Sequence, residues 1–247
     1  MQFSYSAIWD DTIRLTRQHF PLLVAIAGVF IFLPSLILAV MLPPAELSGL
    51  SPDRMIQAMM DHWQRVAPWY VLGTLVTMVG TAAMLRLVFA RDVTVGAALA
   101  FGLALLPFYF LLQLLISVIL LIGFILLIVP CLYLVGRLAP AAALMVAEKR
   151  RNPLDTISRS FAITKGRGWA VFGLVFIVGI VGGISVGVAN TLLGIVFHLA
   201  AGRELATLLM AIVSCALSAA FATLIVMLYA AIYRALTASD PVAAAFE

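Results

Sequence analysis

Long hydrophobic runs, separated by short polar segments, make up most of this chain. Six runs reach the roughly 20 residues that a helix needs to cross the hydrocarbon core of a bilayer. They lie at about 20–42, 67–90, 104–123, 125–147, 169–199 and 204–236. The pattern predicts an all-α integral membrane protein in which residues 1–247 form a single membrane domain with six transmembrane helices.

The third and fourth runs are almost continuous, and residues 103–147 are too long for one helix of ordinary tilt. We expect the turn between these two spans at Gly123. Pro130 then falls in the first turns of the fourth span, where its missing N–H is least costly, or it kinks that helix.

Some polar segments have the pattern of a helix that lies along a membrane surface. Residues 51–66 begin with an N-cap serine and a proline, Ser51 and Pro52, and apolar side chains then recur at helical spacing. This predicts an outer interfacial helix. Residues 1–19 predict a cytoplasmic amphipathic lead-in to the first span.

A second interfacial helix is predicted over 152–166, on the cytoplasmic side. Asn152 is a good N-cap, Pro153 suits the first helical position, and Gly166 suits the C-terminal stop. Its apolar edge is expected to consist of Leu154, Ile157, Phe161 and Thr164.

Composition places the chain among membrane proteins. Hydrophobic residues make up 64% of the 247 residues and charged residues 11%, and the mean hydropathy is +1.16. Soluble domains have about a quarter of their residues charged. Residues 1–20 are polar and contain Asp10 and Asp11, unlike a secretory signal peptide, so we expect no cleaved leader.

Lysine and arginine are distributed unevenly over the two sides, and this bias orients membrane proteins. With both termini inside, one side carries eleven such residues and the other three, while Arg137 lies within the fourth span. The count predicts that the N and C termini are cytoplasmic. The eleven are Arg14, Arg17, Arg86, Arg91, Arg234 and the six of residues 148–168; the three are Arg54, Arg65 and Arg203.

Residues 148–168 form the one densely charged segment, with six basic residues against two acidic ones. Because these residues adjoin hydrophobic spans, attraction to anionic lipid and orientation of the helices explain them better than nucleic acid does. We expect membrane lipids as partners and no nucleic acid. The candidate lipid-headgroup contacts are Lys149, Arg150, Arg151, Arg159, Lys165 and Arg167.

The charged segment also echoes the N-terminus. Asp-Thr-Ile occurs at residues 11–13 and 155–157, each time ahead of a span, and a weaker copy begins at Thr94. One interpretation is an architecture of three repeated units, each an interfacial helix plus a pair of spans. Chance similarity among segments rich in leucine and alanine explains the echo equally well.

No catalytic constellation emerges from the motifs. Residues 183–187 fit the G-x-S-x-G spacing of a hydrolase, but that motif needs a strand and a sharp turn, and Ser185 falls inside an apolar helix. His198 lies more than three turns further along the same helix. Cys131, Cys215 and the three histidines have no metal-ligand spacing. We predict no enzyme activity, no metal and no cofactor.

Two features inside the spans stand out. Arg137 is an intramembrane charge without an acidic residue in any span to pair with it, so it either snorkels, bonds to Gln113 and backbone carbonyls, or contacts a substrate or lipid phosphate. Gly179, Gly183 and Gly187 recur at four-residue intervals. This spacing predicts close packing of the fifth span against small residues of the sixth.

The chain resembles a known bacterial family, most clearly over about residues 125–175. The similarity rests on Leu127-Ile-Val-Pro-Cys-Leu-Tyr-Leu-Val-Gly-Arg137, Leu138-Ala-Pro140, Glu148, Ser158-Arg-Ser160, Ile163-Thr-Lys-Gly166 and Trp169. In these positions the chain is similar to six-span inner-membrane proteins of the glycerophosphodiester phosphodiesterase membrane-domain type and to YciC-like proteins. It departs from their pattern where Cys131 follows Pro130 in place of glycine, which affects the local kink.

The resemblance implies a bacterial inner membrane as location and a module without the soluble phosphodiesterase domain, whose metal-binding acids and histidines have no counterpart here. Our leading hypothesis is a non-enzymatic scaffold, accessory subunit or lipid-interacting module, with lipids and another membrane protein as partners. The alternative is a small transporter or lipid carrier with Arg137 in a cavity. A polar cavity that reaches Arg137 would favour transport, and a dry bundle would favour the scaffold.

Overall fold

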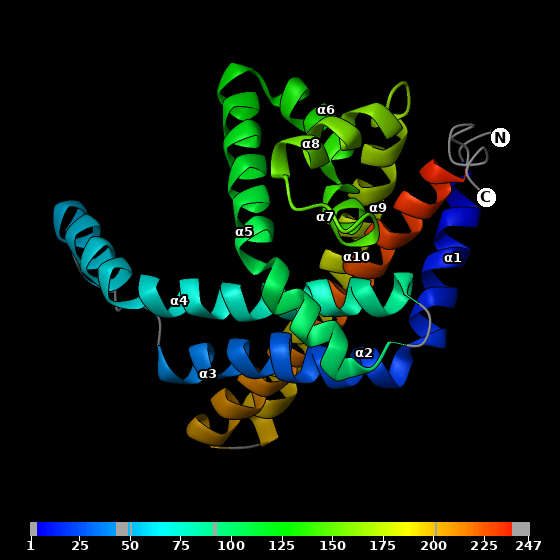
Figure 1. Ribbon diagram of the computed structural model, residues 1–247. Coiled ribbons are helices and arrows are strands. Elements are labelled where there is room, and N and C mark those ends of the chain that lie inside the picture. Colours follow the sequence, from blue (N-terminus) through cyan, green and yellow to red (C-terminus); the bar gives the residue numbers. More distant parts are fainter. Residues whose placement is uncertain (1–3, 43–48, 50, 91–92, 201, 239–247) are drawn as a thin grey trace.

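The computed structural model describes residues 4–42, 49, 51–90, 93–200 and 202–238, and these residues form helices and no strands. The helices are α1 (Tyr5–Gln18), α2 (Phe20–Ala27), the π-helical turn η1 (Gly28–Phe32), α3 (Leu33–Met41), α4 (Pro52–Phe89), α5 (Val95–Leu126), α6 (Ile128–Leu138), α7 (Ala141–Ala147), α8 (Pro153–Ile163), α9 (Gly168–Ala200) and α10 (Arg203–Thr237) (Figure 1).

Six stretches of helix within this part of the chain are long and apolar enough to cross a membrane. They are Phe20–Met41, Pro52–Phe89, Val95–Leu126, Ile128–Ala147, Gly168–Ala200 and Arg203–Thr237. The all-α membrane fold predicted from the hydrophobic runs is confirmed, and the protein is polytopic.

The first span is continuous although Pro34 lies inside it. Proline has no N–H, so the carbonyl of Phe30 loses its usual partner four residues on. The chain widens into the turn η1 just before this proline, and the Ser35 hydroxyl donates to the carbonyl of Ile31 at 2.7 Å. The helix therefore passes the proline through a π-bulge.

The outer interfacial helix expected over 51–66 does not exist as a separate element. Residues 52–89 form one helix, α4, with Pro68 in its interior. Figure 1 shows the N-terminal part of α4 bending away from the rest of the molecule. A proline interrupts one hydrogen bond and bends a helix without ending it, so the amphipathic segment and the second span are joined.

The turn between the third and fourth spans lies at Leu127, whose backbone is extended, four residues beyond the expected Gly123. Gly123 is in the last turns of α5, where an added Cβ would lie 3.3 Å from the Cα of Cys131. Its role is to let the two helices of this hairpin approach. Pro130 lies in the first turn of α6, as predicted.

The α8 helix has the predicted cap, and its buried edge agrees in part with the predicted one. The Asn152 side chain accepts a hydrogen bond from the N–H of Leu154 at 3.0 Å, and Gly166 adopts a φ of +75° after the helix. Of the four residues expected on the apolar edge, Ile157 and Thr164 are buried and Phe161 is half-buried, but Leu154 is 65% exposed. The residues that α8 buries are Pro153, Thr156, Ile157, Ser160 and Ile163.

The echo between the N-terminus and the charged segment extends to the side chains. Thr12 in α1 and Thr156 in α8 are both fully buried, and each hydroxyl donates to the carbonyl four residues before it at 2.8 Å. Thr94, in contrast, caps the continuous helix α5, so no separate interfacial helix begins there. Two of the three expected units thus share this lead-in helix.

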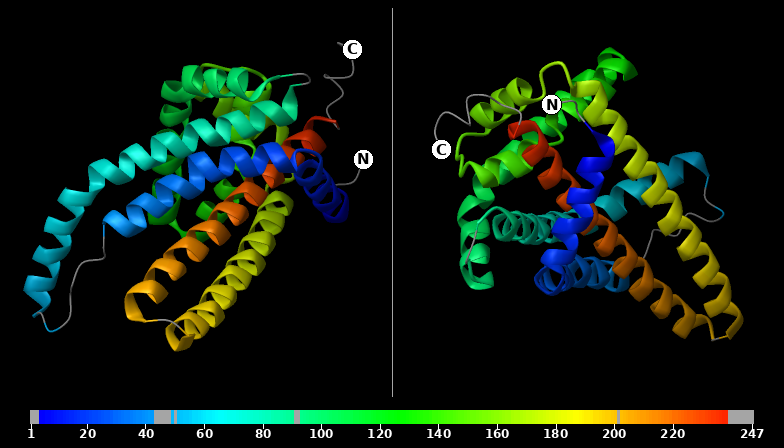
Figure 2. Two further views of the ribbon diagram at one scale, coloured as in Figure 1. Left: turned by 90° about the horizontal axis from the view of Figure 1, so that it is seen from below. Right: turned by 90° about the vertical axis from the view of Figure 1, so that its right-hand side faces the viewer.

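Three groups of helices pack together (Figure 2). The first span lies along α4, and α5 begins against α4, where an added Cβ on Gly102 would lie 2.8 Å from the carbonyl oxygen of Val79. The α9 and α10 helices form a hairpin. The α6, α7 and α8 helices cover its open end, and α1 packs on α10 through buried Ile8 and Leu15.

The expected packing of the fifth and sixth spans through Gly179, Gly183 and Gly187 is corrected by the structure. A Cβ added to any of the three would meet nothing within 4 Å. Contact with α10 runs instead through Gly182, on which the ring of Phe221 lies. Gly182 is one position, about 100° of helix, away from Gly183, so the glycine spacing identified the wrong face.

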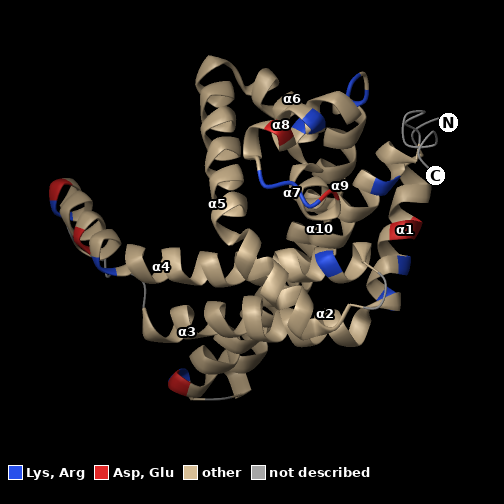
Figure 3. Ribbon diagram, viewed as in Figure 1, with Lys and Arg blue, Asp and Glu red and all other residues tan. Residues whose placement is uncertain are grey.

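Charged side chains gather at the ends of the spans and leave the long helices between them apolar (Figure 3). One group surrounds the α7–α8 and α8–α9 connections, α1 and the end of α10. A second lies at the beginning of α4, and Glu204 lies at the α9–α10 turn. Arg91, counted on the basic side, lies outside the described residues, as do 1–3 of the lead-in.

Replacing Gly182 by leucine should destabilise the fold, whereas Gly183→Leu should not. The first side chain must displace the Phe221 ring, and overpacking of this kind costs about 1–3 kcal/mol. The second enters open space at the lipid-facing surface. Thermal unfolding of both variants in the same detergent measures the difference. A larger loss for Gly183→Leu would restore the glycine strip as the packing face.

Candidate functional site

Arg137, the charge expected inside the membrane, joins two helices, α6 and α8. From α6 its Nη1 donates to the Tyr133 hydroxyl at 2.8 Å, and its Nη2 donates to the carbonyl of Phe161 in α8 at 2.5 Å. The guanidinium carbon also lies 4.9 Å from the centre of the Phe161 ring and 5.5 Å from that of Tyr133. The cation is thus held by a carbonyl, a hydroxyl and two aromatic faces.

The carbonyl that Arg137 contacts belongs to the last turn of α8. Carbonyls in a last turn have no partner in their own helix and carry the negative end of the helix dipole, so a cation there is favourable. The bond is returned by Ser160, whose hydroxyl donates to the Arg137 carbonyl at 2.7 Å. Among the described residues, the buried Nε of Arg137 has no partner. Arg137 is therefore a fastening between α6 and α8.

Two glycines bring α9 to the same place. Gly136 packs on the carbonyl of Gly168, and an added Cβ would lie 2.8 Å from the backbone nitrogen of Phe172. A Cβ on Gly168 would lie 2.7 Å from the Tyr133 ring and 2.8 Å from the Arg137 Cδ. Backbone contact this close needs glycine on both helices. The sequence pattern gives these two glycines no packing role, although Gly136 directly precedes Arg137 and Gly168 directly precedes Trp169.

Glu148 is the centre of a second cluster, at the end of α7. It pairs with Arg150 at 2.6 Å and with Arg159 of α8 at 3.6 Å, and it accepts a hydrogen bond from the Tyr233 hydroxyl of α10 at 3.3 Å. Lys149, the next residue, has a φ of +50°. Ion pairs at such half-exposed positions contribute little individually, but together they fix the direction in which α8 leaves α7.

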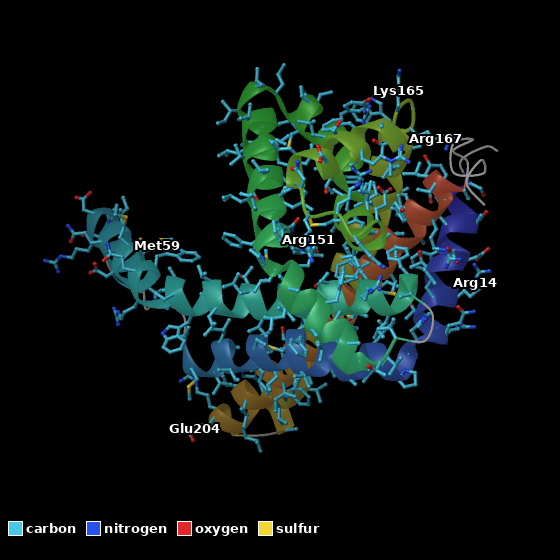
Figure 4. The ribbon with its side chains drawn as sticks, in the orientation of Figure 1. Arg14, Met59, Arg151, Lys165, Arg167 and Glu204 are labelled. Carbon is cyan, nitrogen blue, oxygen red and sulfur yellow. The ribbon has the colours of Figure 1, made fainter. Side chains whose placement is uncertain are left out.

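The six candidate headgroup contacts divide into two sets. Arg150 and Arg159 are half-buried and engaged with Glu148, and Arg167 is half-buried. Lys149, Arg151 and Lys165 are exposed. The exposed ones belong to the connections that precede and follow α8. Figure 4 shows Lys165 and Arg167 beside the start of α9, with Glu204 at the far end of the molecule.

Gln113 does not meet Arg137. It lines a cavity of about 630 Å³ bounded mainly by α3, α4, α5 and the end of α6, together with Tyr109, Thr77 and Tyr229. Val135 and Leu138 of α6 also line this cavity, whereas Arg137 points toward α8 and α9. The cavity and the intramembrane charge are two separate features.

Ser185 and His198, the two residues considered for catalysis, do not contact each other; each bonds to a backbone carbonyl of its own helix. The Ser185 hydroxyl donates to the Val181 carbonyl at 2.7 Å, and Nδ1 of His198 lies 2.8 Å from the Gly194 carbonyl. Each is satisfied by its own helix. Within the described part of the chain, no three histidine, cysteine or acidic side chains gather where they could hold a metal ion.

Comparison with protein-family models, with curated proteins and with solved structures finds no match to this chain.

Replacing Arg137 by methionine should loosen α8 and lower stability. The variant loses two hydrogen bonds from a charged donor, each worth about 1.5–3 kcal/mol, and leaves the Phe161 carbonyl with only the long 3.5 Å contact from the Thr164 hydroxyl. Hydrogen–deuterium exchange should rise over residues 153–167 and change little in α4. Arg203→Met, at the exposed start of α10, is the control. Unchanged exchange over 153–167 would show that the cation does not fasten α8.

Proposed function

We propose that this protein is a non-enzymatic, lipid-interacting module of a bacterial inner membrane. The observation that carries the proposal is the way α8 is held. Arg137 and Glu148 fasten this helix across the ends of α6, α7 and α10, and exposed cations flank it on both sides. A basic surface fixed at the end of six apolar spans suits the anionic headgroups of a membrane.

Some of the basic residues around α8 are paired with an acidic residue and others are exposed, and this difference supports the proposed role. Arg150 and Arg159 pair with Glu148, so this carboxylate does not compete with lipid headgroups for the exposed cations. Lys149, Arg151 and Lys165 remain exposed on the connections at either end of α8. Cations near an anionic lipid surface contribute about 1 kcal/mol each. Three of them, on the connections at the two ends of a fixed helix, give a lipid contact of useful strength without a deep pocket.

The same arrangement supports the proposed relationship to the glycerophosphodiester phosphodiesterase membrane-domain and YciC-like proteins. The residues that carry the resemblance include Gly136, Arg137, Ser160 and Trp169. In this structure they meet at one junction, where α6, α8 and α9 come together. A sequence pattern that is scattered along the chain but gathered in space is what a shared fold would require.

A lipid carrier is the second candidate, and the cavity beside Gln113 is the observation that favours it. This differs from the transporter considered on sequence grounds, since Arg137 does not line the cavity. The scaffold hypothesis, with another membrane protein as partner, has no comparable feature among the described residues. We therefore place lipid interaction first.

Neutralising the exposed cations should weaken the preference for anionic lipid. In the variant Lys149→Gln/Arg151→Gln/Lys165→Gln, association with phosphatidylglycerol should fall by up to about 3 kcal/mol, and its dependence on salt should decrease. Native mass spectrometry with phosphatidylglycerol and phosphatidylcholine measures this preference. Arg54→Gln/Arg65→Gln/Arg203→Gln is the control with equal charge loss. Equal effects of the two triple variants would contradict the proposed surface.

The proposed orientation places both termini and α8 in the cytoplasm. In a background without Cys131 and Cys215, Lys165→Cys should be protected from a membrane-impermeant thiol reagent added to intact spheroplasts. Arg203→Cys should be labelled, because the count of lysine and arginine assigns it to the opposite side. The reverse labelling pattern would invert the topology.

A further inference from the structure

We propose that the cavity between α4 and α5 is a binding site for an uncharged lipid whose carbonyl oxygens stand at the head of its hydrocarbon chains. The site is separate from the basic surface around α8 and goes beyond the function proposed for that surface. Its volume of about 630 Å³ is within the range of about 300–1,000 Å³ of pockets that bind small molecules.

The cavity exists because α5 changes direction. Its first turns run against α4, and beyond Pro107, in the interior of the helix, α5 turns away from α4 (Figure 1). The walls that face each other across the resulting angle are the middle of α4 and residues 109–120 of α5. Leu38 of α3 and Leu138 of α6 close two further sides.

The lining is mostly apolar, and several of its hydroxyls already have partners. Ser35, Thr74, Thr77 and Thr81 each donate to a carbonyl of their own helix, at 2.7 to 3.0 Å. These groups can accept a hydrogen bond from a ligand but have no proton left to donate. The donors for a ligand must come from other side chains.

Three neutral side chains supply such donors: Tyr109, Gln113 and Tyr229. All three line the cavity, and within the described part of the chain no side-chain hydrogen bond ties any of them to the protein. Tyr109 is only 4% exposed. Among the described residues, the buried side-chain polar atoms without a hydrogen-bond partner are Arg137 Nε and Asn190 Oδ1, and the Tyr109 hydroxyl is not one of them. The lining thus includes two phenolic O–H groups and an amide N–H₂ that can donate to acceptor oxygens of a ligand.

Charge decides which lipid fits. None of the described residues that line the cavity is Lys, Arg, His, Asp or Glu. An anionic phosphate placed there would lose its hydration without gaining a cation, which is costly in an apolar site. Ester or quinone carbonyls are neutral and accept hydrogen bonds from phenol and amide groups. The cavity therefore selects a neutral head and rejects a phospholipid head.

The exposed fraction of the lining side chains indicates where the cavity opens. Ala39, Tyr70 and Thr74 are exposed, while Leu85 and Leu138 are buried at the other end. The exposed residues lie toward the α3–α4 connection, far from the termini in Figure 1, on helices that are long and apolar enough to cross a membrane. A lipid would enter sideways from the leaflet on that side.

The test compares two lipids that share their chains and differ in their heads, and adds a quinone as a third probe. Dioctanoylglycerol and dioctanoyl phosphatidic acid differ only by the phosphate, and decylubiquinone presents quinone carbonyls instead of esters. Binding to purified protein in detergent is measured by native mass spectrometry and by quenching of intrinsic fluorescence. We expect dioctanoylglycerol, decylubiquinone or both to bind at least about tenfold more tightly than the phosphatidic acid.

Variants locate the site. Tyr109→Phe and Gln113→Leu remove the donors and keep the shape, and the double variant should weaken binding by about tenfold or more. Tyr5→Phe and Gln64→Leu, outside the cavity, are the matched controls. Ala39→Trp should block the exposed end without disturbing the core, and its neighbour Val40→Trp, which does not line the cavity, should leave binding unchanged.

The outcomes separate the possibilities. Tighter binding of dioctanoylglycerol alone assigns the ester carbonyls, and tighter binding of decylubiquinone alone assigns the quinone; both results support the site. Equal binding of phosphatidic acid, or no binding of either neutral probe, would overturn it. Unchanged binding in both the double variant and Ala39→Trp would also overturn it. The basic-surface triple variant should bind the neutral probes normally, so failure of the surface proposal and of this one can be told apart.

Discussion

The contact between the Arg137 guanidinium and the last turn of α8 is the constraint on which the arrangement of α6, α8 and α9 depends. A lone cation within an apolar span is costly, and a helix end without a partner for its carbonyls is costly too. Here the guanidinium of Arg137 donates to the Phe161 carbonyl at that helix end, so the cation and the carbonyl satisfy one another. The aromatic rings of Tyr133 and Phe161 cover the cation. The glycines at 136 and 168 then allow α9 to start directly above this contact.

The rest of the basic segment follows from that fastening. Once the end of α8 is fixed on α6, its beginning is set by Glu148, which collects Arg150, Arg159 and the Tyr233 hydroxyl from three parts of the chain. The exposed cations are then those on the two connections. A segment that looks uniformly basic in the sequence therefore contains residues that hold the fold and residues that face outward.

The two polar features of the membrane interior have opposite chemistry. The Arg137 site is charged, small and filled by protein groups, whereas the cavity beside α4 is large, neutral and lined by donors that no described protein group uses. The kink of α5 at Pro107 and the bulge before Pro34 lie in helices on either side of α4. Prolines inside these spans thus shape the space between helices while the helices themselves continue.

The sequence by itself determined the six spans, the caps of α8 and the place of Pro130 in the first turn of its helix. Hydrophobic length and capping are local properties that each segment carries alone. Only the tertiary structure decided which side of a helix is covered. Gly182 and not Gly183 meets Phe221, Leu154 is exposed, and Arg137 turns from Gln113 toward Phe161. Neighbouring positions differ by about 100° around a helix, so in an apolar chain periodicity cannot tell a lipid-facing side from a protein-facing one. That choice depends on the partner helix, which the sequence of one segment does not contain.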